Sequence, residues 1–140
     1  MNDQSSLDAR ILDDVADALI SADRSGTITR WNRASSALFG YSAGEALGQS
    51  LDLIIPEHLR AAHWKGFDAA LESGTMKLQG RPTLTRAAHK DGRKLYIEMT
   101  FALVRNAAGD VLGSVAMARD VTERVERERA AKAASPPQNS

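Results

Sequence analysis

Apolar and polar positions alternate over three segments in the second half of the chain, and this period of two predicts β-strands. The segments are 77–88, 93–104 and 111–119, separated by glycine-containing turns. The second segment has the clearest pattern, with Lys94, Tyr96, Glu98 and Thr100 on one side and apolar residues on the other. Those apolar residues are Leu95, Ile97, Met99, Phe101 and Leu103. We therefore expect one face of this part of the sheet to be buried and the other to face solvent.

Two shorter strands are predicted nearer the N-terminus, at 18–22 and 27–31, around the turn Asp23-Arg24-Ser25-Gly26. Helical patterns fill the space between these two strands and the later three. This order predicts an α+β domain in which short helices cover one face of a five-stranded antiparallel sheet.

The helices are predicted from periodicity and from capping residues. The expected helices are an amphipathic lead-in at 5–18, two short helices at 32–39 and 43–47, a longer one at 57–72, and a charged one at 121–134. The expected caps and stops are Asn32 with Gly40, Ser42 and Glu45 with Gly48, and Pro56 with Gly74. The last helix begins with Val121 and Val125 at coiled-coil spacing, but Glu128 and Lys132 stand where the apolar positions of a coiled coil would continue.

Composition narrows the possible classes of protein. The 140 residues suffice for one domain, and the absence of cysteine excludes disulfides, thiolate metal sites and cysteinyl-flavin chemistry. The 18 basic and 18 acidic residues cancel, so we expect no binding to nucleic acid. No apolar run approaches the roughly 20 residues that span a bilayer, and residues 1–8 carry no export pattern. The expected location is cytoplasmic, without membrane attachment.

An enzymatic function is not expected. No nucleophile, base and orienting acid occur in a recognisable arrangement, and Glu57, Glu72 and Glu98 fit solvated faces better than a catalytic pair. We therefore expect the chain to act through a signalling partner, such as a kinase or a regulator, or to be a piece of a longer signalling protein.

Several motifs together resemble the PAS domains. They are Asp23-Arg24-Ser25-Gly26, Trp31-Asn32-Arg33-Ala34, Leu38-Phe39-Gly40-Tyr41, Ile55-Pro56-Glu57, Lys90-Asp91-Gly92 and Arg119-Asp120-Val121-Thr122-Glu123-Arg124. The resemblance implies a sensor or dimerisation domain at 10–122, after a tail and helix start at 1–9 and before an output-helix stub and disordered tail at 123–140. It also implies a ligand held between sheet and helices, and a junction at Asp120 and Thr122 where the last strand meets the output helix. Both residues also suit a simple helix cap.

His63 is the most informative single residue. It lies one turn after Leu59 and one turn before Phe67, with Ala62 and Gly66 expected on the same inward face. A buried imidazole needs a partner for its ring nitrogens, and neutral imidazole is a good ligand for haem iron.

The chain further resembles the FixL-like, haem-binding oxygen-sensor PAS domains, in which the proximal histidine matches His63. The resemblance then implies a haem b site lined by Gly66, Phe67, Met99 and Phe101 as well. Thr83 stands where those sensors carry the distal arginine. Arg81, two residues earlier and expected on the same strand face, is a possible substitute, and Arg81 or Lys77 is a possible partner for a haem propionate.

Other interpretations remain open at this stage. A histidine on an apolar face is commonly a hydrogen-bonded core residue, and Met76 and Met117 are expected to fill core space. His58 and His89 are expected at the surface. The domain is alternatively a cofactor-free module that dimerises through the lead-in helix and the stub from Val121, or a sensor of flavin or of a carboxylate. In each case we expect a homodimer formed through the flanking helices.

Overall fold

Five antiparallel strands form one sheet, as predicted, and their order in the sheet is β2-β1-β5-β4-β3. The computed structural model describes residues 3–75 and 81–134. The strands are β1 (Ala18–Asp23), β2 (Ile28–Trp31), β3 (Thr83–Ala88), β4 (Lys94–Arg105) and β5 (Val111–Asp120). Pairing of β1 with β5 places the first and last strands at the centre, where Ile20 faces Ala116 across the ladder.

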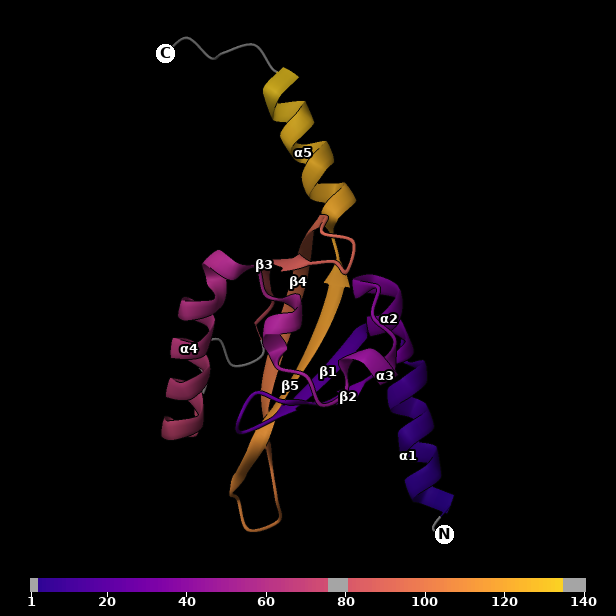
Figure 1. Cartoon of the computed structure of the whole chain (residues 1–140), viewed down its shortest axis with the longest axis vertical. Helices are drawn as coiled ribbons and strands as arrows, with labels where there is room; N and C mark the ends of the chain where they lie inside the picture. Colours follow the sequence, from indigo (N-terminus) through magenta and orange to yellow (C-terminus); the bar gives the residue numbers. More distant parts are fainter. Residues whose placement is uncertain (1–2, 76–80, 135–140) are drawn as a thin grey trace.

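The helices that flank this sheet are α1 (Asp3–Asp14), α2 (Arg33–Phe39), α3 (Ala43–Ala46), α4 (Arg60–Ser73) and α5 (Thr122–Ala134). Two 3-10 turns, η1 (Leu51–Ile54) and η2 (Glu57–Leu59), precede α4. Figure 1 shows α4 at the left and α2 and α3 at the right of the view, with α1 and α5 projecting at opposite ends. Phe39 of α2 and Phe67 of α4 both pack on the same core cluster. None of the helices in the described ranges combines the length and hydropathy that a membrane crossing requires.

Three predicted boundaries are wrong. The lead-in helix ends at Asp14 rather than at residue 18, because the carbonyl of Asp17 accepts a hydrogen bond from Asn32 Nδ2 and Ala18 joins β1. The helix expected from residue 57 begins with the turn η2 and becomes α-helical at Arg60. In the described part of the strand expected at 77–88, pairing starts only at Thr83, since Pro82 has no N–H to give to a ladder.

The hydrophobic core lies between the inner face of the sheet and the helical layer. Its buried residues from the sheet include Ile20, Leu95, Ile97, Met99 and Ala118, and those from the helical layer are Phe39, Ala46, Leu51 and Ile54. The inward side of the predicted alternation is confirmed for Leu95, Ile97 and Met99. The outward side is wrong at Tyr96, which is only 8% exposed because it packs with Val121 and Val125.

Asn32 joins the helical layer to the sheet. Its side chain is buried, and its Oδ1 accepts hydrogen bonds from the backbone N–H groups of Leu19 (2.9 Å) and Ser35 (3.0 Å) and from Ser35 Oγ (3.0 Å). Its Nδ2 donates to the carbonyl of Asp17 at 3.1 Å. The predicted cap is therefore confirmed, and the same side chain also holds β1 against the start of α2.

Replacement of Asn32 by alanine should destabilise the fold by about 2–4 kcal/mol, because it removes a helix cap and leaves the Leu19 N–H buried without an acceptor. The matched control is Ser42→Ala, which removes the exposed cap of α3 and should cost about 1 kcal/mol. Urea unfolding of both variants measures the difference. Equal losses in the two variants would show that Asn32 acts as an ordinary cap only.

Candidate functional site

Trp64 attaches the first half of α4 to the body of the fold. Its Nε1 donates to Asp52 Oδ1 at 2.8 Å, and its ring lies over Gly26, where an added Cβ would stand 2.2 Å from Cη2. Gly26 also has a φ of 78°, which disfavours any other residue there. Arg60 adds hydrogen bonds from its guanidinium to the carbonyls of Ile55 (3.1 Å) and Asp52 (3.2 Å). Sequence reasoning missed Trp64, although a large aromatic residue next to a candidate ligand was a visible signal.

His63 stands in an aromatic surrounding on α4. The centroid of its ring lies 4.7 Å from that of Trp64, edge to face, and 5.9 Å from that of Phe67, stacked at 29°. The Nδ1 atom is buried and has no hydrogen-bond partner among the described residues. Burial lowers the pKa of His63 from its ordinary value of 6.5, although the charges of Asp52 and Asp68 act in the opposite direction. The neutral form of the imidazole is therefore favoured, and its Nδ1 has no hydrogen-bond partner among the described residues. A metal ligand requires a neutral imidazole with a free nitrogen.

The structure gathers some of the other predicted site residues near one region of the core. Met99 is buried on the inner face of β4 and pairs with Thr83 of β3. Phe67 and Phe101 are half-buried, and both pack against the core cluster that contains Met99. The ring contacts of His63 are with the aromatic residues of its own helix, Trp64 and Phe67.

Other predicted site residues lie elsewhere. Gly66 and Ala62 were expected on the inward face of α4, but both are exposed and no atom lies within 4 Å of a Cβ built on Gly66. The inward face is instead centred on Trp64, Phe67 and Leu71, since these are the larger apolar side chains. Arg81 is exposed and precedes β3, so the expectation that it shares a strand face with Thr83 is wrong.

Two predicted residues, Lys77 and Met76, lie outside the described residues. Of the two histidines expected at the surface, His58 is exposed as predicted. Met117 is half-buried on β5 but lies on the face opposite to the core residues Ala116 and Ala118, so the expectation that it fills core space is wrong.

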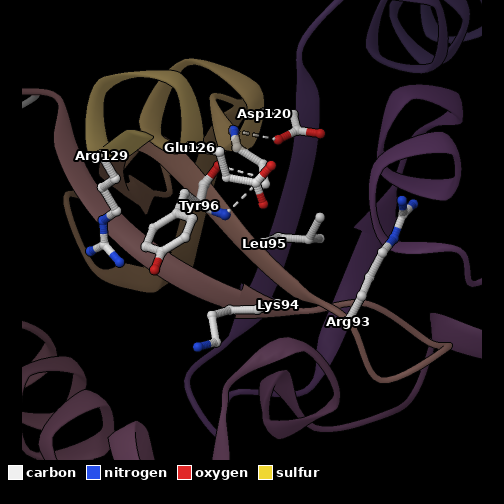
Figure 2. Close-up of a pocket in the computed structure, with 8 residues that line it drawn as sticks. Arg93, Lys94, Leu95, Tyr96, Asp120, Glu126 and Arg129 are labelled. Carbon is white, nitrogen blue, oxygen red and sulfur yellow. Dashed lines mark hydrogen bonds between the residues drawn. The ribbon is translucent and has the colours of Figure 1, made fainter. Parts of the chain in front are cut away.

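The junction between β5 and α5 is built from Asp120, Thr122 and the backbone of Tyr96 (Figure 2). Asp120 Oδ1 accepts from the Thr122 N–H at 2.9 Å, which caps α5. The hydroxyl of Thr122 accepts from the Tyr96 N–H at 2.9 Å and donates to the Tyr96 carbonyl at 3.3 Å, and the Val121 N–H also donates to that carbonyl. Capping and strand attachment therefore occur together, and α5 is fixed to strand β4.

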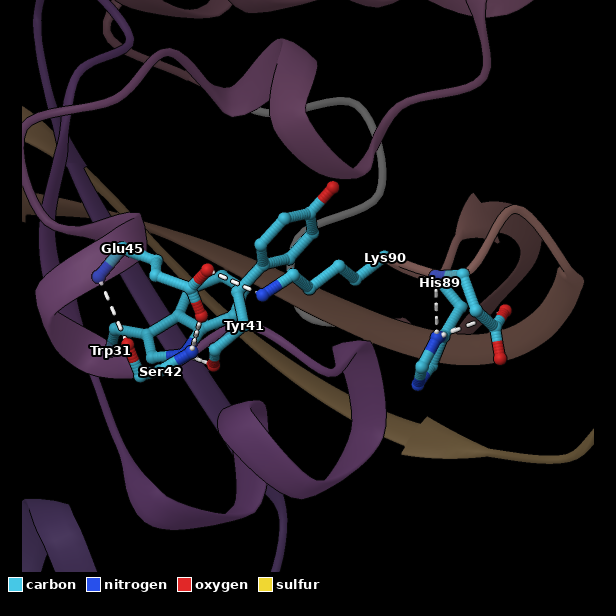
Figure 3. A network of polar contacts seen from close by, with 7 residues as sticks. Trp31, Tyr41, Ser42, Glu45, His89 and Lys90 are labelled. Carbon is cyan, nitrogen blue, oxygen red and sulfur yellow. Dashed lines mark hydrogen bonds and ion pairs between the residues drawn. The ribbon is translucent and has the colours of Figure 1, made fainter.

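A second set of polar contacts fastens the β3–β4 turn to α2 and α3 (Figure 3). The Lys90 N–H donates to the Phe39 carbonyl at 2.9 Å, and Lys90 Nζ pairs with Glu45, which lowers the pKa of that carboxyl. The expectation of a surface position for His89 is wrong, because its ring lies on Gly40 and only 13% of the side chain is exposed. Nothing local in the sequence indicates these contacts, since they join residues more than 40 positions apart.

Comparison with known proteins identifies the fold family. A sequence model of the PAS fold matches residues 6–121. The oxygen sensor protein DosP of Escherichia coli is 30% identical over 92 residues, which are 66% of this chain and 11% of DosP. The sensor protein FixL of Bradyrhizobium diazoefficiens is 40% identical over 53 residues, 38% of this chain and 10% of FixL. The chain thus spans a small fraction of these curated relatives.

Solved structures agree with this result. The PAS domain of a protein from Colwellia psychrerythraea superposes with a TM-score of 0.74 at 26% identity, covering 86% of this chain and 99% of that one. An RNA-binding Light-Oxygen-Voltage receptor superposes with a TM-score of 0.72 at 29% identity, covering 91% of this chain and 36% of that one.

The lowered pKa of His63 predicts a pH-dependent stability. The imidazole of His63 binds a proton more tightly in the unfolded chain than in the native state. The contribution of His63 to the free energy of unfolding is therefore fully present above about pH 6.5 and is lost as the pH falls through the lower native pKa. His63→Gln should therefore flatten the fall in unfolding free energy between neutral pH and pH 5, measured by urea denaturation. His58→Gln, at an exposed position, should keep the wild-type dependence. If the unfolding free energy of His63→Gln depended on pH as in the wild type, groups other than His63 would cause that dependence.

Proposed function

The chain belongs to the PAS fold family, and on this basis we propose that it is a sensory domain that binds haem b through His63 and senses a diatomic gas or a redox state. The observation that carries the proposal is the buried, unpartnered Nδ1 of a histidine whose pKa is lowered by burial. A buried polar atom without a partner costs free energy, and coordination of a metal removes that cost. The similarity to DosP, named as an oxygen sensor, and to FixL, named as a sensor protein, supports the same choice.

The residues on the inner face are suited to such a group. His63 would supply a nitrogen that binds the iron, and Phe67, Met99 and Phe101 would supply the apolar lining that haem requires. Bound haem would supply an iron centre with an open coordination position for a small ligand. Trp64 fixes the rotation of α4 through Asp52 and thereby the direction of the His63 ring.

The choice of sensed molecule depends on Thr83. Thr83 is half-buried opposite Met99 and offers one hydroxyl where the resemblance implies an arginine. Arg81 is exposed and stands outside β3, so no cation of this strand faces the pocket lining. A hydroxyl is a weaker donor than a guanidinium toward a negatively polarised ligand, which favours a gas that needs no hydrogen-bond donor, or a redox signal, over tight oxygen binding.

Strand β4 connects this site to the output helix. Met99 pairs with Ala118 of β5, and Ile97 pairs with Asp120, so the inner-face residues lie directly beside the junction. Tyr96, in the same strand, holds Thr122 through two hydrogen bonds. A displacement of Met99 along or across the sheet therefore changes the position of the first turn of α5.

The decisive experiment is an absorption spectrum of the protein after expression with a supply of haem. We expect a Soret band in the wild type, and His63→Ala should lose or shift it because the axial nitrogen is removed. The control His58→Ala, at an exposed position close to α4, should keep the wild-type band. An unchanged band in His63→Ala would contradict the assignment of the axial ligand. A wild-type protein without a band would contradict haem binding as a whole.

A second candidate function is dimerisation without a tight cofactor, and α1 favours it. Leu7, Ile11 and Leu12 are large apolar side chains with 56%, 50% and 36% exposure, on a helix that the described part of the chain leaves largely uncovered. Burial of these side chains against a second copy would stabilise a dimer.

We expect the purified domain to sediment as a dimer, and Leu7→Glu with Ile11→Glu should raise its dissociation constant at least tenfold, because charges would enter the interface. Analytical ultracentrifugation measures this. The control is Leu112→Glu, which changes an equally exposed leucine in β5, away from α1. A monomer at all concentrations, or an equal effect of the control, would exclude α1 as the interface.

A further inference from the structure

A groove at the base of α5 is not used by the proposed function. It has a volume of ≈ 530 Å³ and lies between the start of β4 and the first three turns of α5 (Figure 2). Its lining includes Lys94 and Tyr96 from β4 and Glu126 and Arg129 from α5. The Tyr96 side chain projects from the face of β4 opposite to Met99, so the groove and the His63 region lie on opposite faces of the sheet.

Two cations of this groove have no acidic partner among the described residues. Neighbouring cations do have partners, since Arg93 pairs with Asp91 at 3.6 Å and Arg124 pairs with Glu98 at 3.8 Å. Lys94 and Arg129 take part in no such pair in the described part of the chain. Both side chains belong to exposed residues and are available to a ligand from solvent.

The Tyr96 ring orients the side chain of Arg129 before any ligand binds. Its guanidinium carbon lies 4.8 Å from the centroid of the Tyr96 ring, which is a cation–π contact. Tyr96 is buried and its backbone is fixed by Thr122, so the ring offers a rigid support. In Figure 2 the Tyr96 hydroxyl, the Arg129 guanidinium and the Lys94 ammonium lie at the same side of the groove. A planar guanidinium, an ammonium and a hydroxyl are the donors that recognise an oxyanion.

The acidic residues of the groove limit the charge of the ligand. Asp120 already accepts the Thr122 N–H, and the carboxylate of Glu126 also lines the groove. With Arg93, Lys94 and Arg129 against Asp120 and Glu126, the lining carries one net positive charge. This small net positive charge matches a ligand with a single oxyanionic group, whereas a nucleic acid or another polyanion would need more cations than the groove supplies.

We propose that this groove binds a small oxyanion, a phosphate or a carboxylate, between Lys94 and Arg129 with the Tyr96 hydroxyl as a third donor. Because Lys94 belongs to β4 and Arg129 to the third turn of α5, the ligand bridges the sheet and the output helix. It is a second input to α5, independent of whether His63 binds haem. Binding ties the helix to the sheet and protects its amides from hydrogen exchange.

The test is a titration of the ¹⁵N-labelled full chain with sodium phosphate and, separately, with sodium acetate, each at constant ionic strength set with sodium chloride. We expect saturable shifts of the Tyr96 and Thr122 amides and of the Arg129 side chain with at least one of the two anions, and slower exchange of the Val125 amide in its presence. Saturation by phosphate alone identifies a phosphate site, and saturation by acetate alone identifies a carboxylate site.

Three variants distinguish binding of the anion in this groove from a general effect of the positive charge of α5. Lys94→Gln and Arg129→Gln should each weaken binding roughly tenfold, because each removes a charge-assisted hydrogen bond. Arg127→Gln removes the same charge from an exposed position of α5 outside the groove and should leave the affinity unchanged. An absence of saturable shifts with both anions, or an equal loss in Arg127→Gln, would overturn the proposal.

Discussion

The buried amide of Asn32 determines how the helical layer joins the sheet, and the remaining architecture depends on that joint. It lies at the end of β2, bonds to the backbone of β1 at Leu19 and to the Asp17 carbonyl, and caps α2 at Ser35. Any other course of the chain at this point would leave buried donors without acceptors, at a cost of several hydrogen bonds. The chain therefore turns back over the inner face here, which sets the positions of α2, α3 and η1 above the core.

The opposite end of the helical layer is attached much less firmly. Of the residues of α4, only Leu71 is fully buried, and the first half of the helix is held by Trp64 on Gly26 and by its bond to Asp52. A helix with few buried contacts is an element that moves at low cost without disruption of the core. His63 stands on this helix, so the candidate ligand residue lies on the part of the helical layer that can respond to a ligand. The hydrogen bonds of Asn32 hold the remainder of the helical layer against the sheet.

The sequence predicted the parts of the fold whose causes are local. The five strands, the cap at Asn32 and the capping box at Ser42 follow from period and from side chains that bond to their own neighbours, and the structure confirms them. The errors have distant causes. Tyr96 was expected in solvent because α5, which covers it, comes 26 positions later, and His89 was expected at the surface because its support, Gly40, lies in α2's cap. The predicted inward face of α4 included Ala62 and Gly66 beside Phe67 and Leu71 and omitted Trp64, because the periodicity gave too little weight to the size of the side chains. The identity of a ligand is not predictable in this way, since many pockets share the same apolar lining.

Strand β4 carries residues of both candidate sites and is hydrogen-bonded to the start of α5. Successive residues of a strand point to opposite faces, so Met99 belongs to the inner face and Tyr96 to the outer face of one rigid ladder. Thr122 is bonded to the backbone of that strand rather than to a side chain, and it therefore follows a displacement that arises on either face. If two ligands change the position of the same helix, each must change the affinity of the other by the same factor. If an oxyanion between Lys94 and Arg129 and a ligand near His63 both changed the position of α5 through β4, the two sites would accordingly be coupled without any contact between them.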